Sequence, residues 1–381
     1  MKTIGVDIRV LGTGRISGIE EYTEQVVSHM IARGGDVAWK LFYSGRTPLV
    51  WREWMRAPQV QVIETRSSNR LLWLSTRALG TPKLDELVGG ADVFFFPHFL
   101  LGALSPACKR VMTWHDLSYE RMPYLLSPYR RIWHALQMQP RRQAKIADHH
   151  IAVSSATARD LEVLYQIPQH RCTVIPSGID SHLRRASDVA VQEWRARRAI
   201  TAPFILALGT REPRKNLPAL VRAWDITRKD PSCGGLQLVL AGPRGWMERD
   251  LHRAVAATSA PSDVHFIEHI DRSECALLLS AASLLAYPSL MEGFGFPPLE
   301  AMACGTPVVA SATSSLFETV GDAGVLVDPY RVDALARALI AVHADADLRQ
   351  RLVARGYEHA HEYSWERAAE ATRSVLLSVL S

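Results

Sequence analysis

The first half of the chain consists of short apolar runs that are closed by turn residues, and helical stretches separate most of them. Runs rich in β-branched and aromatic residues are typical of strands. We expect strands at Ile4–Val10, Val37–Tyr43, Val60–Glu64, Val93–Phe96, Arg110–Trp114, His150–Val153 and Thr173–Ile175. The apolar face of the first helix is formed at helical spacing by Ile19, Tyr22, Val26 and Met30. This alternation predicts a parallel sheet with helices on both faces.

The pattern lapses over residues 181–202, which are polar and rich in arginine, and a second α/β pattern then begins. Its expected strands are Phe204–Leu208, Leu236–Leu240, Val264–Ile267, Leu284–Tyr287, Pro307–Val309 and Val325–Val327, with helices such as Asn216–Thr227 and Arg272–Ala281 between them. Trp365–Leu380 has the spacing of an amphipathic helix. We therefore predict two Rossmann-like, doubly wound domains at 1–182 and 203–363, a linker at 183–202 and a terminal helix within 364–381.

The composition is that of a soluble globular protein. The chain has 381 residues, of which 48% are hydrophobic and 22% are charged, and this length suits two domains. Its five cysteines lack CxxC spacing, so we expect reduced thiols in a cytoplasmic protein rather than disulfides or a zinc site. The sequence shows no signal-peptide pattern and no apolar stretch of the ~20 residues that span a bilayer.

The net charge of +5 comes from the first half of the chain. Residues 1–180 carry 22 Lys and Arg against 16 Asp and Glu, whereas residues 181–381 carry 22 against 23. The basic excess could face an anionic membrane surface or a phosphorylated acceptor, or it could simply be solvated. Peripheral contact of the first domain with the inner face of the cell membrane therefore stays open. No nucleic-acid recognition motif accompanies the charge.

The segment EGFGFPPLEAMACGTP, which begins at Glu292, carries the most specific chemistry. Gly293 and Gly295 allow the backbone to approach a ligand closely, and the two prolines that follow suit the first turn of a helix. A helix start after a strand is a site for phosphate. Glu292 precedes this helix and Glu300 is expected within its first turn, so two carboxylates can accept hydrogen bonds from sugar hydroxyls. A solvated surface loop is the alternative interpretation.

The string EGFGFPPLEAMACGTPVVASATSSLFETVGDAGVLVDP resembles the donor motif of the retaining glycosyltransferases of family 4, which have the two-domain GT-B fold. The resemblance implies that Glu292 positions the transferred sugar and that Glu300 binds the ribose hydroxyls. It also implies that the loop residues between them, Gly293, Phe294 and Gly295, contact the donor. The terminal segment EYSWERAAE resembles the family's helix that crosses back onto the first domain.

The turn GTREPRKN follows the first strand of the second pattern. Lysine offers a phosphate a point charge and arginine a planar fork, although a solvated basic turn is the alternative. In the family, a lysine at the position of Lys215 binds the donor diphosphate. The family's partner arginine directly follows the strand's glycine, but Thr210 stands there in this chain. Arg211 and Arg214 therefore both remain candidates for donor binding.

Two histidines follow strands of the first pattern, where ligand-binding residues of such sheets lie. His115 follows Arg110–Trp114, and His98 follows Val93–Phe96. A structural role is the alternative for each. The family carries a His-Asp pair at the position of His115, with the histidine against the donor sugar. His115 is therefore a catalytic candidate beside Glu292 and Lys215, and His98 is a candidate for binding the acceptor.

A glycine-rich loop, GTGRISG, follows the first strand. Its third glycine is one residue late for the dinucleotide fingerprint GxGxxG, and no acid follows at a clear second strand end. The family closes this loop over the donor phosphates and the acceptor. We therefore expect Gly14 at the donor and Arg15 at the acceptor.

These features predict a retaining hexosyltransferase without a metal or other cofactor, in which cations and backbone amides stabilise the departing nucleoside diphosphate. Runs such as GTREPRKNL look most like bacterial mannosyltransferases of polysaccharide, O-antigen or lipopolysaccharide assembly. That likeness implies GDP-mannose as donor and a saccharide or lipid-linked saccharide as acceptor. The alternatives are a UDP-sugar donor, an NAD-linked oxidoreductase and a non-catalytic protein that binds sugar nucleotides.

Overall fold

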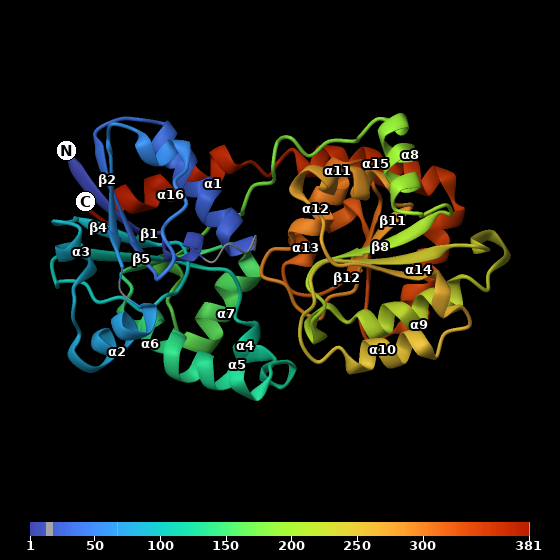
Figure 1. Ribbon diagram of the computed structural model, residues 1–381, viewed down its shortest axis with the longest axis horizontal. Coiled ribbons are helices and arrows are strands. Elements are labelled where there is room, and N and C mark those ends of the chain that lie inside the picture. Colours follow the sequence, from blue (N-terminus) through green and yellow to red (C-terminus); the bar gives the residue numbers. More distant parts are fainter. Residues whose placement is uncertain (13–17, 67, 381) are drawn as a thin grey trace. The chain divides into compact units, whose positions relative to one another are not determined.

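The computed structural model describes residues 1–12, 18–66 and 68–380, and it divides into two compact units (Figure 1). Unit 1 consists of Met1–Gly178 and Trp365–Ser381, and unit 2 consists of Ile179–Ser364. The segment expected as a linker, 183–202, lies within unit 2. It contains α8 (Asp188–Arg197), which packs on α11 (Arg272–Ala281).

Unit 1 is built on a parallel sheet, which has seven strands within the described residues, in the order β3-β2-β1-β4-β5-β6-β7. The strands are β1 (Lys2–Asp7), β2 (Val37–Ser44), β3 (Val60–Thr65), β4 (Val93–Phe96), β5 (Lys109–Trp114), β6 (His149–Ala152) and β7 (Cys172–Val174). Each coincides with a predicted strand to within a few residues. The first ends early, at Asp7, where the chain turns into a 3-10 helix and Nη2 of the buried Arg9 lies 2.5 Å from the Asp7 carboxylate.

The helices of unit 1 include a returning segment from the end of the chain. They are α1 (Gly18–Ala32), α2 (Asn69–Leu79), α3 (Leu84–Leu87), α4 (Ser118–Arg121), α5 (Pro128–Ile132), a π-helical turn (Trp133–Met138), α6 (Pro140–Ile146), α7 (Ser155–Tyr165) and α16 (Trp365–Ser378). The last of these packs along α1, where the rings of Trp365 and Tyr22 lie 6.1 Å apart. An ion pair of 2.9 Å between Arg33 and Glu370 adds to this contact.

Unit 2 is a second parallel sheet, in the order β10-β9-β8-β11-β12-β13 within the described residues. Its strands are β8 (Phe204–Leu208), β9 (Gln237–Ala241), β10 (Val264–Ile267), β11 (Leu284–Tyr287), β12 (Val308–Ser311) and β13 (Val325–Val327). Besides α8 and α11, its helices are α9 (Leu217–Thr227), α10 (Arg249–Ala256), α12 (Phe296–Ala303), α13 (Leu316–Thr319), α14 (Val332–Ala344) and α15 (Ala346–Ala360).

Both sheets bury their central strands on both faces. All four residues of β4 (VFFF) and of β11 (LLAY) are buried, so the apolar run of a central strand is continuous instead of alternating. In each sheet the strand order reverses once, between β1 and β4 in unit 1 and between β8 and β11 in unit 2. Open α/β sheets bind their ligands outside the carboxyl ends of the strands at such a reversal.

Candidate functional site

The candidate donor site lies where β8 and β11 end, at the strand-order reversal of unit 2. Lys215 ends a 3-10 turn (Pro213–Lys215) that follows β8, and Glu292 lies in the loop after β11. Gly209, directly after β8, has a φ of +136°, and a Cβ there would lie 3.4 Å from Cε of Lys215. The backbone conformation therefore favours glycine here, whereas the contact with Lys215 is an ordinary one.

A buried carboxylate connects the two loops. Oε1 of Glu292 lies 2.7 Å from Nζ of Lys215, and Oε2 lies 2.5 Å from Nη1 of Arg214. Glu292 is only 6% exposed. Burial raises the pKa of this carboxyl group, but the charges of Arg214 and Lys215 outweigh that effect and lower the pKa to about 2. The structure thus brings three of the predicted residues together, with Lys215 and Arg214 on either side of the ionised carboxylate of Glu292.

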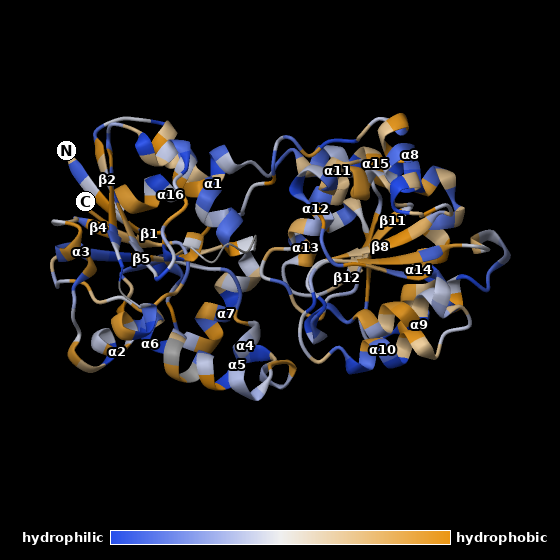
Figure 2. Cartoon of the chain, in the orientation of Figure 1, coloured by the Kyte–Doolittle hydropathy of each residue, from blue (hydrophilic) through white to orange (hydrophobic). Residues whose placement is uncertain are grey.

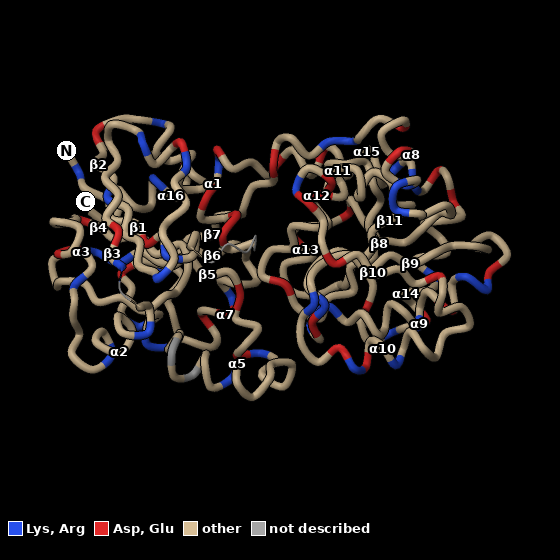
Figure 3. Tube along the Cα trace, in the orientation of Figure 1, with Lys and Arg blue, Asp and Glu red and all other residues tan. Residues whose placement is uncertain are grey.

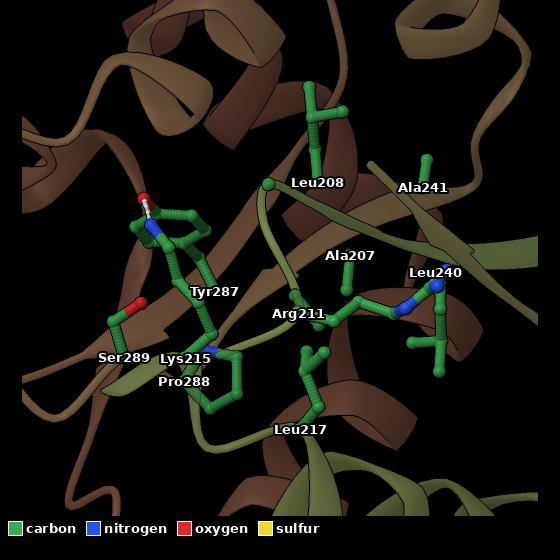
Figure 4. A pocket seen from close by; sticks show the side chains of 12 residues that line it. Ala207, Leu208, Arg211, Lys215, Leu217, Leu240, Ala241, Tyr287, Pro288 and Ser289 are labelled. Atoms are coloured by element: carbon green, nitrogen blue, oxygen red, sulfur yellow. Dashed lines mark hydrogen bonds between the residues drawn. The ribbon is translucent and has the colours of Figure 1, made fainter. Parts of the chain in front are cut away.

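Tyr287, which sequence analysis did not select, holds Lys215 from a second side. Nζ of Lys215 donates a hydrogen bond of 2.5 Å to the Tyr287 hydroxyl and lies 4.6 Å from the centre of its ring (Figure 4). Burial lowers the pKa of Lys215, and the charge of Glu292 opposes that change. The one signal in the sequence is a hydroxyl-bearing ring at the end of an aliphatic strand.

The two arginines of the turn have different surroundings. Arg214 is clamped between the carboxylates of Glu212, at 2.6 Å, and Glu292. Arg211 is buried and forms ion pairs of 3.1 and 3.2 Å with Glu248 and Glu268. Figure 4 shows its side chain extending away from Lys215. The structure therefore groups Arg214 with Lys215, whereas Arg211 ties together the loops that follow β8, β9 and β10.

Two serines after β12 fix the loop that carries Glu292, and sequence analysis selected neither. The backbone N–H of Glu292 donates a hydrogen bond of 2.8 Å to Oγ of Ser314. Oγ of the fully buried Ser315 lies 3.0 Å from the carbonyl oxygen of Glu292 and 2.9 Å from that of Phe294. These contacts join segments more than twenty residues apart, so no local pattern reveals them.

The glycine-rich loop continues into α12, as the sequence predicts. Gly295 precedes the helix with a φ of +98°, and a Cβ there would lie 2.9 Å from the side chain of Leu316. Phe294 is buried, and Gly293 is buried beside it. Glu300 is the fifth residue of α12, one position beyond the first turn in which we expected it, and it is half-buried.

A small pocket opens beside the lysine (Figure 4). Its wall is formed at the ends of β8, β9 and β11 by Ala207, Leu208, Gly209, Arg211, Lys215, Leu217, Leu240, Ala241, Ala286, Tyr287, Pro288 and Ser289. Most of these side chains are apolar, so the amine of Lys215 is one of the few charged groups that reach this space. Such a setting strengthens the attraction of the amine for an anion.

The predicted histidines of unit 1 are neighbours. His98 follows β4 and His115 follows β5, and their ring centres lie 5.8 Å apart. Nε2 of His115 lies 2.8 Å from the carbonyl oxygen of Pro97. Because a carbonyl only accepts, this nitrogen carries the proton and Nδ1 is left as an acceptor. Tyr22 packs edge-on against the ring of His115 at 4.9 Å.

Both imidazoles are uncharged at neutral pH. Burial lowers the pKa of His115, and the hydrogen bond to Pro97 opposes this only in part. Burial also lowers the pKa of His98 well below its usual value, and the neighbouring His115 and His134 add to the effect. Nδ1 of His98 is buried and has no hydrogen-bond partner among the described residues.

The remaining expectations concern the glycine-rich loop, metal ions and the membrane. Gly14 and Arg15 lie outside the described residues. Within the described residues, no group of three or more His, Cys, Asp or Glu side chains is arranged to hold a metal ion. None of the described helices is long and apolar enough to cross a membrane.

Comparisons with known proteins identify the family. The profile of the family described as "Glycosyl transferases group 1" matches residues 191–359, and that of "Glycosyltransferase Family 4" matches residues 16–183. O-antigen chain mannosyltransferase B of Escherichia coli is 30% identical over 304 residues, which cover 80% of this chain and 77% of that protein. The D-inositol 3-phosphate glycosyltransferase of Salinispora tropica is 34% identical over 59% of this chain and 49% of its own length.

Solved structures share the fold at lower identity. Sucrose-phosphate synthase of Thermosynechococcus elongatus superposes with a TM-score of 0.76 at 21% identity and covers 100% of this chain and 99% of its own. Anabaena HepE in complex with UDP and glucose gives 0.74 at 18%, with coverage of 99% and 100%. The fold and the family matches define a glycosyltransferase of GT-B architecture. The chain belongs to glycosyltransferase family 4. An NAD-linked oxidoreductase finds no support in these matches.

Proposed function

We propose that this enzyme transfers a hexose, with retention of anomeric configuration, from a nucleotide-sugar donor to a saccharide or lipid-linked saccharide. The observation that carries the proposal is the ionised Glu292 between Lys215 and Arg214 at the strand-order reversal of unit 2. Two half-buried cations next to a helix start suit a diphosphate, whose charge grows as the bond to the sugar breaks. Sugar transfer requires this kind of stabilisation.

The cations act on the leaving group. Lys215 is held in place by Tyr287 and Glu292, so it needs little reorganisation when a diphosphate binds beside it. Arg214 supplies the second cation from the same turn. The backbone amides of Gly293, Phe294 and Gly295, just before α12, are assigned to the phosphate oxygens.

The carboxylates act on hydroxyl groups. Glu292 is ionised at neutral pH and only accepts hydrogen bonds, which suits the hydroxyls of the transferred sugar. Glu300, one turn into α12, is assigned to the ribose. In unit 1, His115 is assigned to orient the sugar, because its Nδ1 is an acceptor and its ring is held by Pro97 and Tyr22. His98 is assigned to the acceptor.

GDP-mannose is the donor that we propose, and the acceptor belongs to bacterial polysaccharide assembly. The support is the resemblance to mannosyltransferases and, among the relatives, the E. coli O-antigen chain mannosyltransferase. A UDP-sugar is the second candidate, because HepE, which shares the fold, binds UDP and glucose. The choice concerns the base and the sugar, since the diphosphate site is the same for both.

The test is a binding screen followed by a transfer assay. A ligand that binds only the native state raises the melting temperature, so GDP, UDP and ADP should be compared at equal concentration, each with its sugar conjugates. We expect the largest rise with GDP and GDP-mannose, and α-linked product from the α-linked donor. A larger rise in melting temperature with UDP would replace GDP-mannose by a UDP-sugar as the proposed donor. If no nucleotide sugar binds, or none is hydrolysed or transferred, the proposal of catalysis fails.

A further inference from the structure

Two segments of unit 1, residues 68–83 and 121–147, contain no acidic residue. They carry nine cations: Arg70, Arg77, Lys83, Arg121, Arg130, Arg131, Arg141, Arg142 and Lys145. Over residues 1–178 as a whole, Lys and Arg number 22 and Asp and Glu 15, so outside these segments 13 cations stand against 15 acids. The two segments therefore hold the whole basic excess of this part of the chain. Figure 3 shows Lys and Arg in blue and Asp and Glu in red along the trace.

The two segments lie side by side although they are far apart in the sequence. Nη1 of Arg77, on α2, donates a hydrogen bond of 2.7 Å to the carbonyl oxygen of Leu136 in the π-helical turn. That turn continues α5 and is followed directly by α6. In Figure 1 these helices lie along one side of unit 1. We call the exposed surface of α2, α5, the turn and α6 the basic-apolar face.

Apolar side chains stand among these cations in solvent. The largest are Leu71 (64% exposed), Leu74 (54%), Leu79 (75%), Tyr129 (71%), Ile132 (59%) and Leu136 (52%). On α2 the contact with the core is made instead by Leu72 and Thr76, so the exposed leucines belong to its other sides. Figure 2 shows the hydrophobic colouring of this helix. Large apolar groups gathered on one surface mark an interaction site.

Several of the cations are available to a partner. Arg131, Arg142 and Lys145 are exposed and form no ion pair within the described residues. In contrast, Arg121 pairs with Asp160 at 2.6 Å and Arg141 with Glu120 at 2.8 Å. An exposed cation without a partner keeps its full attraction for an anionic surface and loses no internal contact when it binds.

We infer that the basic-apolar face binds an anionic lipid surface, with the leucines and aromatic rings at the boundary of headgroups and acyl chains and the cations at the lipid phosphates. Cations and aliphatic groups combined on helices suit this boundary. Nucleic acid would use the cations but offers little to leucine side chains. A second copy would oppose one cation-rich surface to another, and like charges disfavour that arrangement.

The experiment measures co-sedimentation of the full chain with vesicles of phosphatidylcholine, with and without phosphatidylglycerol. The charge variant is Arg131→Glu/Arg142→Glu/Lys145→Glu. Its matched control changes three exposed cations of unit 2, Arg197→Glu/Arg222→Glu/Arg351→Glu, and so has the same net charge. We expect the wild type and the control to bind the anionic vesicles, and the charge variant to bind about 100-fold more weakly, as the loss of three cations near the surface implies.

A second variant tests the apolar part without changing the charge. Leu71→Ser/Leu74→Ser/Leu79→Ser replaces exposed side chains only, and circular dichroism and thermal melting check that it folds. We expect it to bind anionic vesicles more weakly than the wild type, even at low salt.

Four outcomes would overturn the inference: equal loss in the charge variant and its control, equal binding to neutral vesicles, no binding by the wild type at low salt, or loss of self-association alone in the leucine variant. Sugar transfer is not the readout, so the result stands apart from the proposed donor and acceptor.

Discussion

Nζ of Lys215 and Oε1 of Glu292 lie 2.7 Å apart, although one residue follows β8 and the other follows β11. Glu292 is buried and Lys215 is half-buried, and such a pair is costly to break because the remaining charge is left without compensation. Here the removal of Glu292 would break two ion pairs, because its carboxylate also pairs with Arg214. The pair therefore stabilises the two loops and keeps the cations in place for an incoming diphosphate.

Because of this arrangement, we expect Glu292→Gln to keep diphosphate binding and to lose sugar transfer. Loss of the carboxylate leaves Lys215 without its anion and Arg214 paired with Glu212 alone, so we expect the free energy of unfolding to fall by about 3–5 kcal/mol. With Glu292 neutralised, the two cations should bind the nucleoside diphosphate at least as tightly as in the wild type. Transfer should fall ~100-fold or more, because the hydroxyls of the transferred sugar lose the carboxylate that accepts their hydrogen bonds. Calorimetric titration and initial rates measure the two effects. Weaker diphosphate binding with unchanged transfer would contradict this assignment.

The pH profile gives an independent check. With its pKa held at about 2, Glu292 stays ionised down to strongly acidic solution, so its titration should add no limb to the rate profile above about pH 4. An acid limb near the ordinary pKa of a glutamate that disappears in Glu292→Gln would mean that the two cations do not hold the carboxylate. Initial rates from pH 4.5 to 8, at saturating donor, provide the profile.

Substitutions of Arg214 and Arg211 should affect different properties, the first diphosphate binding and the second stability. Arg214→Met removes a cation beside Lys215 and should weaken diphosphate binding by about tenfold or more. Arg211→Met leaves Glu248 and Glu268 without their shared partner and should mainly lower the melting temperature. The ratio of binding loss to stability loss distinguishes them. If Arg211→Met impairs binding at full stability, Arg211 belongs to the donor site.

The fold was largely predictable because the central strands of both sheets are buried on both faces. Runs such as Val93–Phe96 and Phe204–Leu208 are continuous and apolar, and each became a strand with the expected bounds. The region 181–202 was harder to interpret. Its polar residues suggested a linker, yet Val191 and Trp194 give α8 two buried contacts that suffice to pack it in unit 2.

The candidate site was predictable where one short segment carries both a charge and its turn, as with Lys215 and Glu292. The choice between Arg211 and Arg214 was not, because it depends on Glu248 and Glu268, which come from other loops. Tyr287 was missed for a similar reason. Its hydroxyl accepts a hydrogen bond from Lys215, which comes from the turn after β8, and nothing near Tyr287 in the sequence indicates that contact.

Ser315 should act as a positioning residue for the Glu292 loop. Ser315→Ala removes the one hydroxyl that lies within hydrogen-bonding distance of both carbonyl oxygens, and we expect a loss of about 1–3 kcal/mol in stability together with a fall in kcat. Thr227→Ala is the matched control, because Oγ1 of the buried Thr227 likewise lies within hydrogen-bonding distance of two carbonyl oxygens of unit 2, at 2.9 Å from Ala223 and 3.4 Å from Ala336. The control should lose similar stability but keep kcat. Equal kcat losses would assign Ser315 a general structural role only.

His150 should make the stability of the protein depend on pH. Nε1 of Trp114 donates a hydrogen bond of 3.0 Å to Nδ1 of this fully buried histidine, and burial, with help from Arg171 and His149, lowers its pKa from 6.5 to about 3. Below pH 6.5 the unfolded chain takes up a proton at His150 that the folded chain refuses, so stability is full above 6.5 and declines toward pH 3. The decline can reach about 2 kcal/mol between pH 6.5 and 5, at 1.36 kcal/mol per pH unit.

The variant His150→Gln keeps an acceptor for Trp114 but cannot titrate, and the exposed His170→Gln serves as its control. Urea unfolding at pH 7 and pH 5 measures the free energy of unfolding of each protein. Acid should destabilise His150→Gln less than the wild type, whereas His170→Gln should follow the wild type. If all three proteins lose the same stability on acidification, His150 is not held in its neutral form by burial.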